Sequence, residues 1–321
     1  MSTSTDARRA RAYLQHAAEP SDAVLARYVA EVGPVDAAHH LAAGTAPTDI
    51  QNHCRRDASW QLADTRLETA AGLPARFVIP EDDEWPTAAV AGLSTPATES
   101  EDLGGPPLGL WVQGESRLDE LAAAPSIAIV GSRAATAYGE HHAAELAYGL
   151  ASRGVPVFSG AAYGIDGAAH RGALAADGVT VAVLGCAIDT GYPAGHVSLL
   201  ERIVRSGGAV VSEYPPGTRP ARHRFLVRNR LVAALTTATL VVETGRRSGA
   251  RHTARLAGKL GRPVLALPGP VSSTTSAGCH QLIQDGTARL VTSADDVLAV
   301  MKDRDDTEPE TAVPADEAGR R

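Results

Sequence analysis

Short runs of apolar residues alternate with helical segments through the central and C-terminal parts of the chain. Continuous apolar runs are typical of strands that are buried on both faces of a sheet. We expect such strands at residues 127–131, 155–158, 180–185, 209–213, 239–243, 264–267 and 288–291. Because this strand–helix alternation is typical of parallel pairing, the pattern predicts an α/β fold with a doubly wound, mostly parallel sheet.

The first 75 residues follow a different, helical pattern. Apolar residues recur at helical spacing from Val24 to Val29, and a break at Pro34 precedes a second helix over residues 35–43. We therefore expect a small all-α N-terminal domain over residues 10–75, after a disordered segment at residues 1–9. A helical hairpin of this kind can bind DNA phosphates through backbone amides, although a single hairpin more often only packs helices together.

The predicted α/β domain spans residues 76–302 and begins with a short strand at 76–79. Residues 80–107 are rich in Pro, Gly, Ser, Thr and acids, which indicates a linker inserted before the next strand, at 108–112. Residues 303–321 carry seven acids against three arginines and have no apolar periodicity. We expect this segment to be a disordered acidic tail.

Loops of unusual composition follow the carboxyl ends of the predicted strands. Plain turns precede their amino ends, at the opposite edge of the sheet. Ligands of open parallel sheets bind outside the carboxyl ends of the strands, so this rim is the candidate site. The candidates here are Gly131, Ser132, Arg133, Ser159, Gly160, Gly164, Asp166, Ser248, Gly249 and Arg251. The turn at Gly131 leads into a helix from Thr136, whose free N–H groups and dipole favour an anion. Asp166 could shape such a pocket or cap its own helix.

The most informative stretch, from Arg222 to Leu231, interleaves an aromatic residue with four arginines. Single-strand binders combine aromatic stacking with cationic contacts in this way. Phe225 is therefore expected to stack on a base. Arg222, Arg228, Asn229 and Arg230 complete the predicted site. The alternative is that Phe225 belongs to the core and the arginines are solvated.

The charge is unevenly distributed along the chain. From Arg219 to Arg262 there are eleven Arg and Lys residues against one acid, a local charge of +10 (11 − 1), although the net charge of the whole chain is −7. The other residues therefore carry −17 (−7 − 10). This clustering favours a phosphate-bearing partner.

Several function classes are not expected. Cys54, Cys186 and Cys279 are widely spaced and give neither a disulfide framework nor a zinc site, which fits a reducing cytoplasm. No signal pattern or run of about 18 apolar residues is present, so we expect no membrane association. No nucleophile–base set or Walker motif occurs, so we expect neither catalysis nor a cofactor or bound metal. Glu213 and Glu243 could form an acid/base pair, but they are better placed to orient arginines.

Together these segments resemble the DNA-processing protein A (DprA/Smf) family. The matching motifs follow one another through residues 108–300: Ala128-Ile-Val-Gly-Ser-Arg133, Ser159-Gly-x-x-x-Gly-Ile-Asp166, Ala182-Val-Leu-Gly185, Tyr192-Pro193, Val211-Ser-Glu-Tyr-Pro-Pro-Gly217, Phe225-x-x-Arg-Asn-Arg230, Ser248-Gly-Ala-x-x-Thr-Ala254 and Pro268-Gly269. The resemblance implies an extended Rossmann-like fold with a sterile-alpha-motif-like or helix-hairpin-helix N-terminal domain. It also implies a homodimer that binds single-stranded DNA and loads a RecA-type recombinase in natural transformation. The implied pocket uses Arg133, the loop from Ser159 to Asp166, Arg222, Phe225, Arg228 and Arg230.

The chain departs from the family pattern in places. Tyr163 stands before Gly164 where many members have an arginine, which removes one cation from the pocket rim. Gly278-Cys-His280 replaces an Asn-containing turn, and an acidic segment stands where many members carry a winged-helix module. The rival interpretation is a Rossmann-type nucleotide phosphoribohydrolase that resembles the LOG enzymes. Their Pro-Gly-Gly-x-Gly-Thr-x-x-Glu turn is missing, because Pro270 follows Pro268-Gly269. A scaffold that does not contact nucleic acid would leave the +10 segment unexplained.

Overall fold

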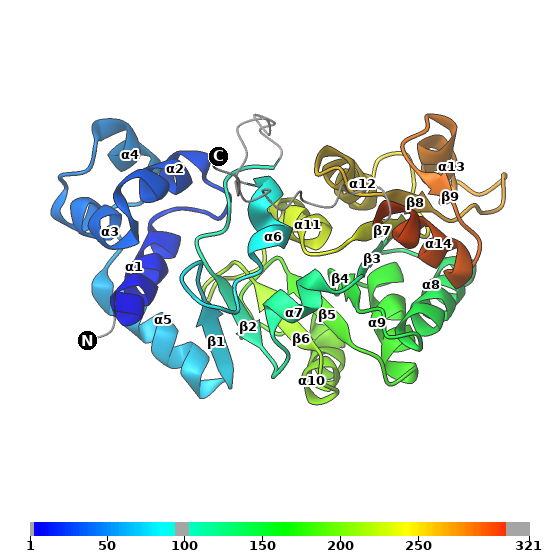
Figure 1. Ribbon diagram of the computed structural model, residues 1–321, viewed down its shortest axis with the longest axis horizontal. Coiled ribbons are helices and arrows are strands. Elements are labelled where there is room, and N and C mark those ends of the chain that lie inside the picture. Colours follow the sequence, from blue (N-terminus) through cyan, green and yellow to red (C-terminus); the bar gives the residue numbers. More distant parts are fainter. Residues whose placement is uncertain (1–2, 94–102, 306–321) are drawn as a thin grey trace, which may run out of the picture.

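A computed structural model describes residues 3–93 and 103–305 of the chain. The middle of the predicted linker and the predicted acidic tail from residue 306 onward lie outside the described residues. One nine-stranded sheet runs through the molecule, and helices cover both of its faces (Figure 1).

The elements agree closely with the predicted alternation. The helices are α1 (Thr3–Ala17), α2 (Ala23–Val32), α3 (Pro34–Ala43), α4 (Thr48–His53), α5 (Trp60–Gly72), α6 (Thr87–Val90), α7 (Leu118–Ala123), α8 (Ala137–Ala151), α9 (Ile165–Ala175), α10 (Val197–Arg205), α11 (Arg222–Ala234), α12 (Gly249–Lys259), α13 (Ala277–Gln284) and α14 (Ala294–Asp305), with 3-10 turns η1 (Ala91–Leu93) and η3 (Ala194–His196). The strands are β1 (Ala75–Val78), β2 (Leu110–Gln113), β3 (Ile127–Val130), β4 (Val157–Ser159), β5 (Thr180–Leu184), β6 (Ala209–Ser212), β7 (Ala238–Val241), β8 (Val264–Ala266) and β9 (Arg289–Leu290).

The strand order is β1-β2-β6-β5-β4-β3-β7-β8-β9. All pairs from β6 to β9 are parallel, while β1 and β2 join one edge in antiparallel pairing. This confirms the predicted doubly wound, mostly parallel α/β sheet. From β3 the chain first builds toward β6 and then crosses to β7 on the other side of β3. The loops after β3 and β7 therefore diverge, which opens a crevice at their carboxyl ends.

The sequence of β3 shows why the sheet forms here. All four of its residues are buried, and successive side chains point to opposite faces. Ile127 and Ile129 pack in the cluster that holds α8, α9 and α14. Ala128 and Val130 pack in the cluster that holds α11 and α12. An apolar run without polar interruption is what a strand covered on both faces requires.

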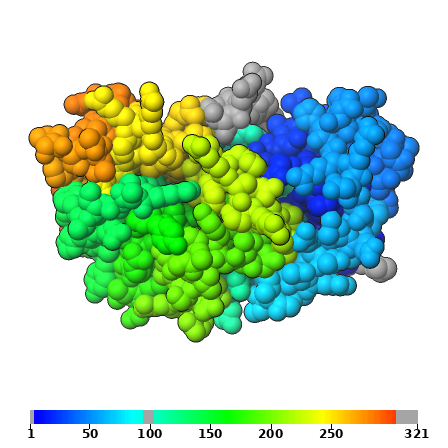
Figure 2. Space-filling model, turned by 180° about the vertical axis from the view of Figure 1, so that it is seen from behind, coloured from blue at the N-terminus to red at the C-terminus, as the bar shows by residue number. Residues whose placement is uncertain are grey.

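The five N-terminal helices form one end of the molecule, beside β1 (Figures 1 and 2). The Tyr13 and Trp60 rings stack between α1 and α5 with centroids 4.7 Å apart. Helix α1 begins at Thr3, so the expectation of disorder over residues 1–9 is wrong for residues 3–9. An ion pair from Arg8 to Asp82, 2.6 Å long, ties this segment to the polypeptide after β1. This contact could not be predicted from local patterns, because its two partners are far apart along the chain.

The segment predicted as a linker at residues 80–107 packs into the core where it is described. It forms α6 and η1, and Trp85, Val90, Leu93 and Leu103 are buried in the same cluster as α11 and α12. Arg262 donates from Nη2 to the Ala89 carbonyl over 3.0 Å. The linker prediction is therefore wrong for residues 80–93 and 103–107, because a few large apolar side chains anchor a segment of otherwise polar composition.

Candidate functional site

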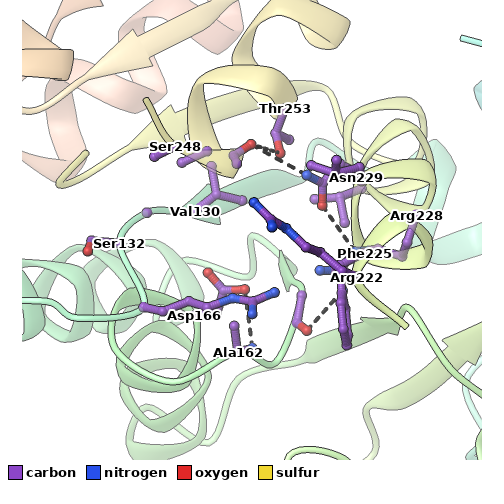
Figure 3. A pocket seen from close by; sticks show the side chains of 17 residues that line it. Val130, Ser132, Ala162, Asp166, Arg222, Phe225, Arg228, Asn229, Ser248 and Thr253 are labelled. Carbon is purple, nitrogen blue, oxygen red and sulfur yellow. Dashed lines mark hydrogen bonds between the residues drawn. The ribbon is translucent and has the colours of Figure 1, made fainter. Parts of the chain in front are cut away.

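A cavity of about 330 Å³ lies at the switch point, outside the carboxyl ends of β3 and β7. Its walls come from the loops after β3 and β4, from α11, and from the first turn of α12 (Figure 3). In Figure 3, Ser248 and Thr253 lie across the cavity from Asp166 and Ala162, and α11 forms a third side. Most of the predicted site residues line it: Gly131, Ser132, Arg133, Gly160, Asp166, Arg222, Phe225, Arg228, Asn229, Ser248 and Gly249.

Arg228 forms the floor of the cavity and is almost fully buried. Its Nη1 donates to the carbonyls of Gly160, over 2.9 Å, and of Val183. A Cβ at position 160 would lie 2.3 Å from Nη2, so a larger residue there would require the guanidinium to shift. Burial lowers the pKa of Arg228, and the nearby Asp166 carboxylate opposes this shift. The floor of the cavity therefore holds a guanidinium group fixed by backbone carbonyls.

Asp166 is the only acid among the described residues that line the cavity. It lies inside the first turn of α9, whose N-cap is Gly164, so the interpretation of Asp166 as an N-cap is wrong. Its carboxylate instead accepts from the Ala162 N–H over 3.3 Å and shapes the preceding loop. Burial raises the pKa of Asp166, while Arg228 acts in the opposite direction. The balance of charge in the cavity is cationic.

Phe225 and Arg133 are in direct contact. The Arg133 guanidinium carbon lies 5.0 Å from the centroid of the Phe225 ring, within cation–π range. The Tyr192 ring lies beside Phe225, with centroids 5.3 Å apart and an interplanar angle of 31°. Arg133 thus covers the face on which a base was predicted to stack, and in this arrangement Phe225 holds Arg133 in place.

Arg230 lies away from the cavity, although it is only two residues from Arg228. It is 1% exposed, and its Nη2 donates to both carboxylate oxygens of Glu213, over 2.6 and 2.7 Å. Burial raises the pKa of Glu213, and the Arg230 guanidinium opposes that shift. The prediction that Arg230 contacts phosphate is wrong, whereas the prediction that Glu213 orients an arginine is confirmed.

Three other predicted residues shape the rim without lining the cavity. Ser159 is buried and donates to the Ile129 carbonyl over 2.6 Å, joining β4 to β3. Gly164 has a φ of 72°, and a Cβ there would lie 2.3 Å from the Ser132 carbonyl oxygen. Arg251 turns back to the carbonyl of Arg246, over 2.7 Å.

The first turn of α8 differs from the predicted anion site. The Glu243 carboxylate accepts from the Thr136 amide over 2.8 Å and from its hydroxyl over 2.9 Å. The Thr275 hydroxyl donates to the same carboxylate over 2.5 Å. Because the protein's own carboxylate fills this position, the prediction of an open helix N-terminus is wrong for α8. The prediction that Glu243 orients arginines is wrong as well, since it binds threonines.

The first turn of α12 faces the cavity instead. Its N-cap is Ser248, whose side chain makes no capping hydrogen bond and whose hydroxyl instead bonds the Thr244 hydroxyl. Ser248 and Gly249 both line the cavity. The N–H groups and the positive end of the helix dipole are therefore directed at the space that Arg133, Arg222 and Arg228 also line.

Only part of the +10 segment contributes to the cavity. Arg224 donates to Glu19 over 2.7 Å, and Arg262 donates to main-chain carbonyls. These arginines, like Arg230, stabilise the fold. Arg222 and Arg228 line the cavity, and Arg133 joins them from outside the segment.

Ala162, in the predicted loop from Ser159 to Asp166, also lines the cavity, whereas the sequence interpretation did not name Val130, Leu226, Val232, Ala250 and Thr253 as site residues. A helical-wheel argument could have found some of them. Arg222, Phe225, Asn229 and Val232 are spaced three or four residues apart and therefore share one face of α11.

One group of side chains in the described part of the chain could hold a metal ion. His141, His142 and Glu145, on α8, offer ligand atoms within 4.8 Å of one another. None of the three lines the cavity. No helix among the described residues is long and apolar enough to span a bilayer.

The family model of DNA recombination-mediator protein A matches residues 76–302. The Mycobacterium tuberculosis protein named "Putative DNA processing protein DprA" is 53% identical over 292 residues, which cover 90% of this chain and 74% of that protein. Protein Smf of Escherichia coli is 41% identical over 228 residues, which cover 70% of this chain and 56% of that protein.

Two solved structures are similar to this one. DNA processing protein A of Streptococcus pneumoniae has a TM-score of 0.66 and 28% identity, with 92% of this chain and 95% of that chain covered. DNA processing protein A of Helicobacter pylori has a TM-score of 0.60 and 27% identity, with 72% of this chain and 96% of that chain covered. The latter structure was described for its single-stranded DNA binding mode.

Proposed function

The chain belongs to the DNA recombination-mediator protein A family, and from this premise we propose that it binds single-stranded DNA and acts without catalysis. The binding site is the cavity at the β3/β7 switch point. Phosphates bind there to arginine side chains and to the free N–H groups of α12. Of its three arginines, Arg228 is buried in the floor of the cavity, while Arg133 and Arg222 are exposed beside it.

One observation carries the proposal: Arg133, Arg222 and Arg228 line one cavity beside an uncapped helix N-terminus. The exposed guanidinium groups of Arg133 and Arg222 can each donate two parallel hydrogen bonds to a phosphate, while Arg228, whose Nη1 donates to main-chain carbonyls, adds positive charge in the floor. The helix N-terminus adds backbone donors and a favourable dipole. A volume of about 330 Å³ suits a small polar group such as a nucleotide phosphate with its sugar.

We further propose that the protein works in the cytoplasm as a homodimer and transfers the bound strand to a RecA-type recombinase during DNA uptake and natural transformation. The family's description as a recombination mediator supports this role. Two pockets in a dimer would hold neighbouring segments of one strand, which raises their effective concentration and favours cooperative coating.

The proposal is tested by fluorescence anisotropy with a labelled oligo-dT at low salt. The wild type binds, a duplex of the same length competes poorly, and Arg133→Ala, Arg222→Ala and Phe225→Ala each weaken binding about tenfold, or about 1.4 kcal/mol. Phe225→Ala acts by removing the support of Arg133. A wild type that does not bind at low salt would refute the proposal, and nucleotide phosphoribohydrolase assays would then test the rival interpretation.

A further inference from the structure

We propose that nucleobases stack on Tyr163 and Tyr192, in a second subsite beside the phosphate cavity, while Phe225 serves to position Arg133. The inference rests on the proposed function, because it says how the same site recognises the unpaired bases of the strand. It assigns base recognition to two residues for which the sequence analysis predicted no stacking role.

A second cavity adjoins the first and shares part of its wall. Arg133, Gly160, Ala162, Phe225 and Arg228 line both cavities. The remaining wall of the second cavity is largely apolar and aromatic: Leu184, Gly185, Cys186, Tyr192, Pro193 and Tyr163. A strand whose phosphate occupies the first cavity therefore has an apolar, aromatic surface next to its sugar and base.

The enclosed volume of the second cavity is only about 30 Å³, so a base cannot enter it. A base would instead lie against exposed ring surface at its mouth. Tyr163 is 49% exposed and Tyr192 is 36% exposed. Phe225 has Arg133 over its ring. The two tyrosines are therefore the more exposed aromatic rings at the site, since Phe225 is half-buried.

Tyr163 is held in place although half of it is exposed. Its hydroxyl accepts from the Gly195 N–H over 3.1 Å. Its ring makes an edge contact with His196, with centroids 4.9 Å apart, and His196 in turn donates from Nδ1 to the Ala161 carbonyl over 2.9 Å. A ring fixed at both ends loses little conformational entropy when a base stacks on it.

Stacking on an aromatic side chain is tolerant of base identity, because every base has a π-face. The subsite therefore explains how the protein binds a strand without reading its sequence, and it gives a signature that phosphate contacts lack. Removing the bases of an oligonucleotide leaves its phosphates intact, so only the stacking contribution is lost.

The test compares oligo-dT with an abasic oligomer of the same length and label. The wild type binds oligo-dT at least tenfold more tightly than the abasic strand. Tyr163→Ala and Tyr192→Ala each lose about tenfold on oligo-dT and bind the abasic strand as the wild type does. Tyr163→Phe keeps most of the preference for bases, since the ring remains.

Gly195→Ala provides a second variant that leaves both tyrosines in the chain. A Cβ at this position would lie 2.8 Å from the Tyr163 hydroxyl oxygen, so the ring must move. We expect part of the Tyr163→Ala loss on oligo-dT and unchanged binding of the abasic strand. Thermal unfolding of each variant checks that the fold is retained.

The outcomes separate this inference from the proposed function. If the tyrosine variants bind both oligomers like the wild type while Arg222→Ala weakens both, the stacking subsite is refuted and the phosphate site stands. Equal losses on both oligomers would refute it too, because they reveal a structural effect. A wild type that binds neither strand refutes the proposed function itself.

Discussion

Helices α8 and α12 begin at the same edge of the sheet, after the two strands that flank the switch point, yet their first turns differ. The N-terminus of α8 is closed by Thr136 and by the Glu243 carboxylate. At the N-terminus of α12 the Ser248 side chain makes no capping hydrogen bond, and this turn faces the cavity. Glu243 lies just after β7, the strand that leads to α12. The residues after β7 therefore do two things: Glu243 accepts hydrogen bonds at the N-terminus of α8, and the chain then continues into α12.

The difference shows that a strand–Gly–turn–helix pattern does not by itself identify an anion site. Such a pattern supplies free N–H groups at either helix. Whether they remain free depends on a carboxylate that arrives from a neighbouring strand, as Glu243 does at α8. The open turn at α12 leaves its donors to water or to a ligand.

Removing the carboxylate at α8 should have the largest effect. Glu243 is 1% exposed and accepts hydrogen bonds from Thr136 and Thr275. Glu243→Ala leaves these donors without their acceptor, so we expect the free energy of unfolding to fall by about 3 kcal/mol. Urea denaturation measures this loss, and Glu243→Gln should recover part of it. A Glu243→Ala variant as stable as the wild type would contradict the closed-terminus account.

Placing a carboxylate at the first turn of α12 should leave stability intact and weaken DNA binding. Gly249 is the exposed first residue of the helix, and the nearest atom to a Cβ there is Asn229 Nδ2, at 3.9 Å. Gly249→Glu should leave stability unchanged or raise it by up to about 1 kcal/mol through the helix dipole. Oligo-dT binding should weaken about 100-fold, or about 2.7 kcal/mol, because the new charge repels phosphate. Gly249→Gln is the matched neutral control, and equal weakening by both variants would refute the charge argument.

The buried His170 should make the free energy of unfolding depend on pH. It is fully buried, and burial lowers its pKa from 6.5 to about 3. Its Nδ1 donates to Thr180, whose own hydroxyl proton goes to Val157, and its Nε2 has no hydrogen-bond partner among the described residues. Protonation would therefore place an unpaired N–H in the core.

Since the unfolded chain binds this proton more readily, His170 contributes stability above pH 6.5 that is lost as the pH falls toward 3. Between pH 6.5 and 5 the loss is about 2 kcal/mol. Urea denaturation at pH 7.5 and 5 should show it, and His170→Gln should reduce the difference. An unchanged difference in that variant would contradict the assignment.

The smallest predicted effect concerns the N-cap residues of α8 and α12, Thr136 and Ser248. Thr136 accepts from the Gly139 amide over 3.2 Å, as an N-cap does, whereas Ser248 makes no such bond. Thr136→Ala should therefore cost about 1 to 2 kcal/mol of stability, and Ser248→Ala only a few tenths. Equal losses in urea denaturation would show that both turns are capped alike.

The strands and the position of the site could be predicted because they depend on local patterns. Continuous apolar runs marked most of the parallel strands, although β9 contains the exposed Arg289, and the rule about carboxyl ends placed the cavity at the correct edge. The direction and the partners of individual side chains could not be predicted in this way. Arg228 and Arg230 are two residues apart in one helix, and they point to a cavity and to Glu213 respectively. The partners that each arginine meets on neighbouring strands and loops decide where its side chain points.

Two further errors have the same cause. Residues 3–9 belong to α1, which Arg8 ties to Asp82, and residues 80–93 pack through Trp85 and Leu93, which are buried in the core. Composition alone describes such segments as polar. Contacts between distant parts of the chain decided these outcomes, and no motif marked them.

The salt dependence of oligo-dT binding tests the central claim most directly. Arg222 lines the cavity, while Arg205 is an exposed arginine in the last turn of α10, before β6 and so at the opposite edge of the sheet. For single strands, the slope of log affinity against log salt changes by about 0.7 for each phosphate contact. We predict that Arg222→Ala lowers the slope by about this amount and that Arg205→Ala leaves it unchanged. Equal slopes for the two variants, or a wild type insensitive to salt, would contradict the account.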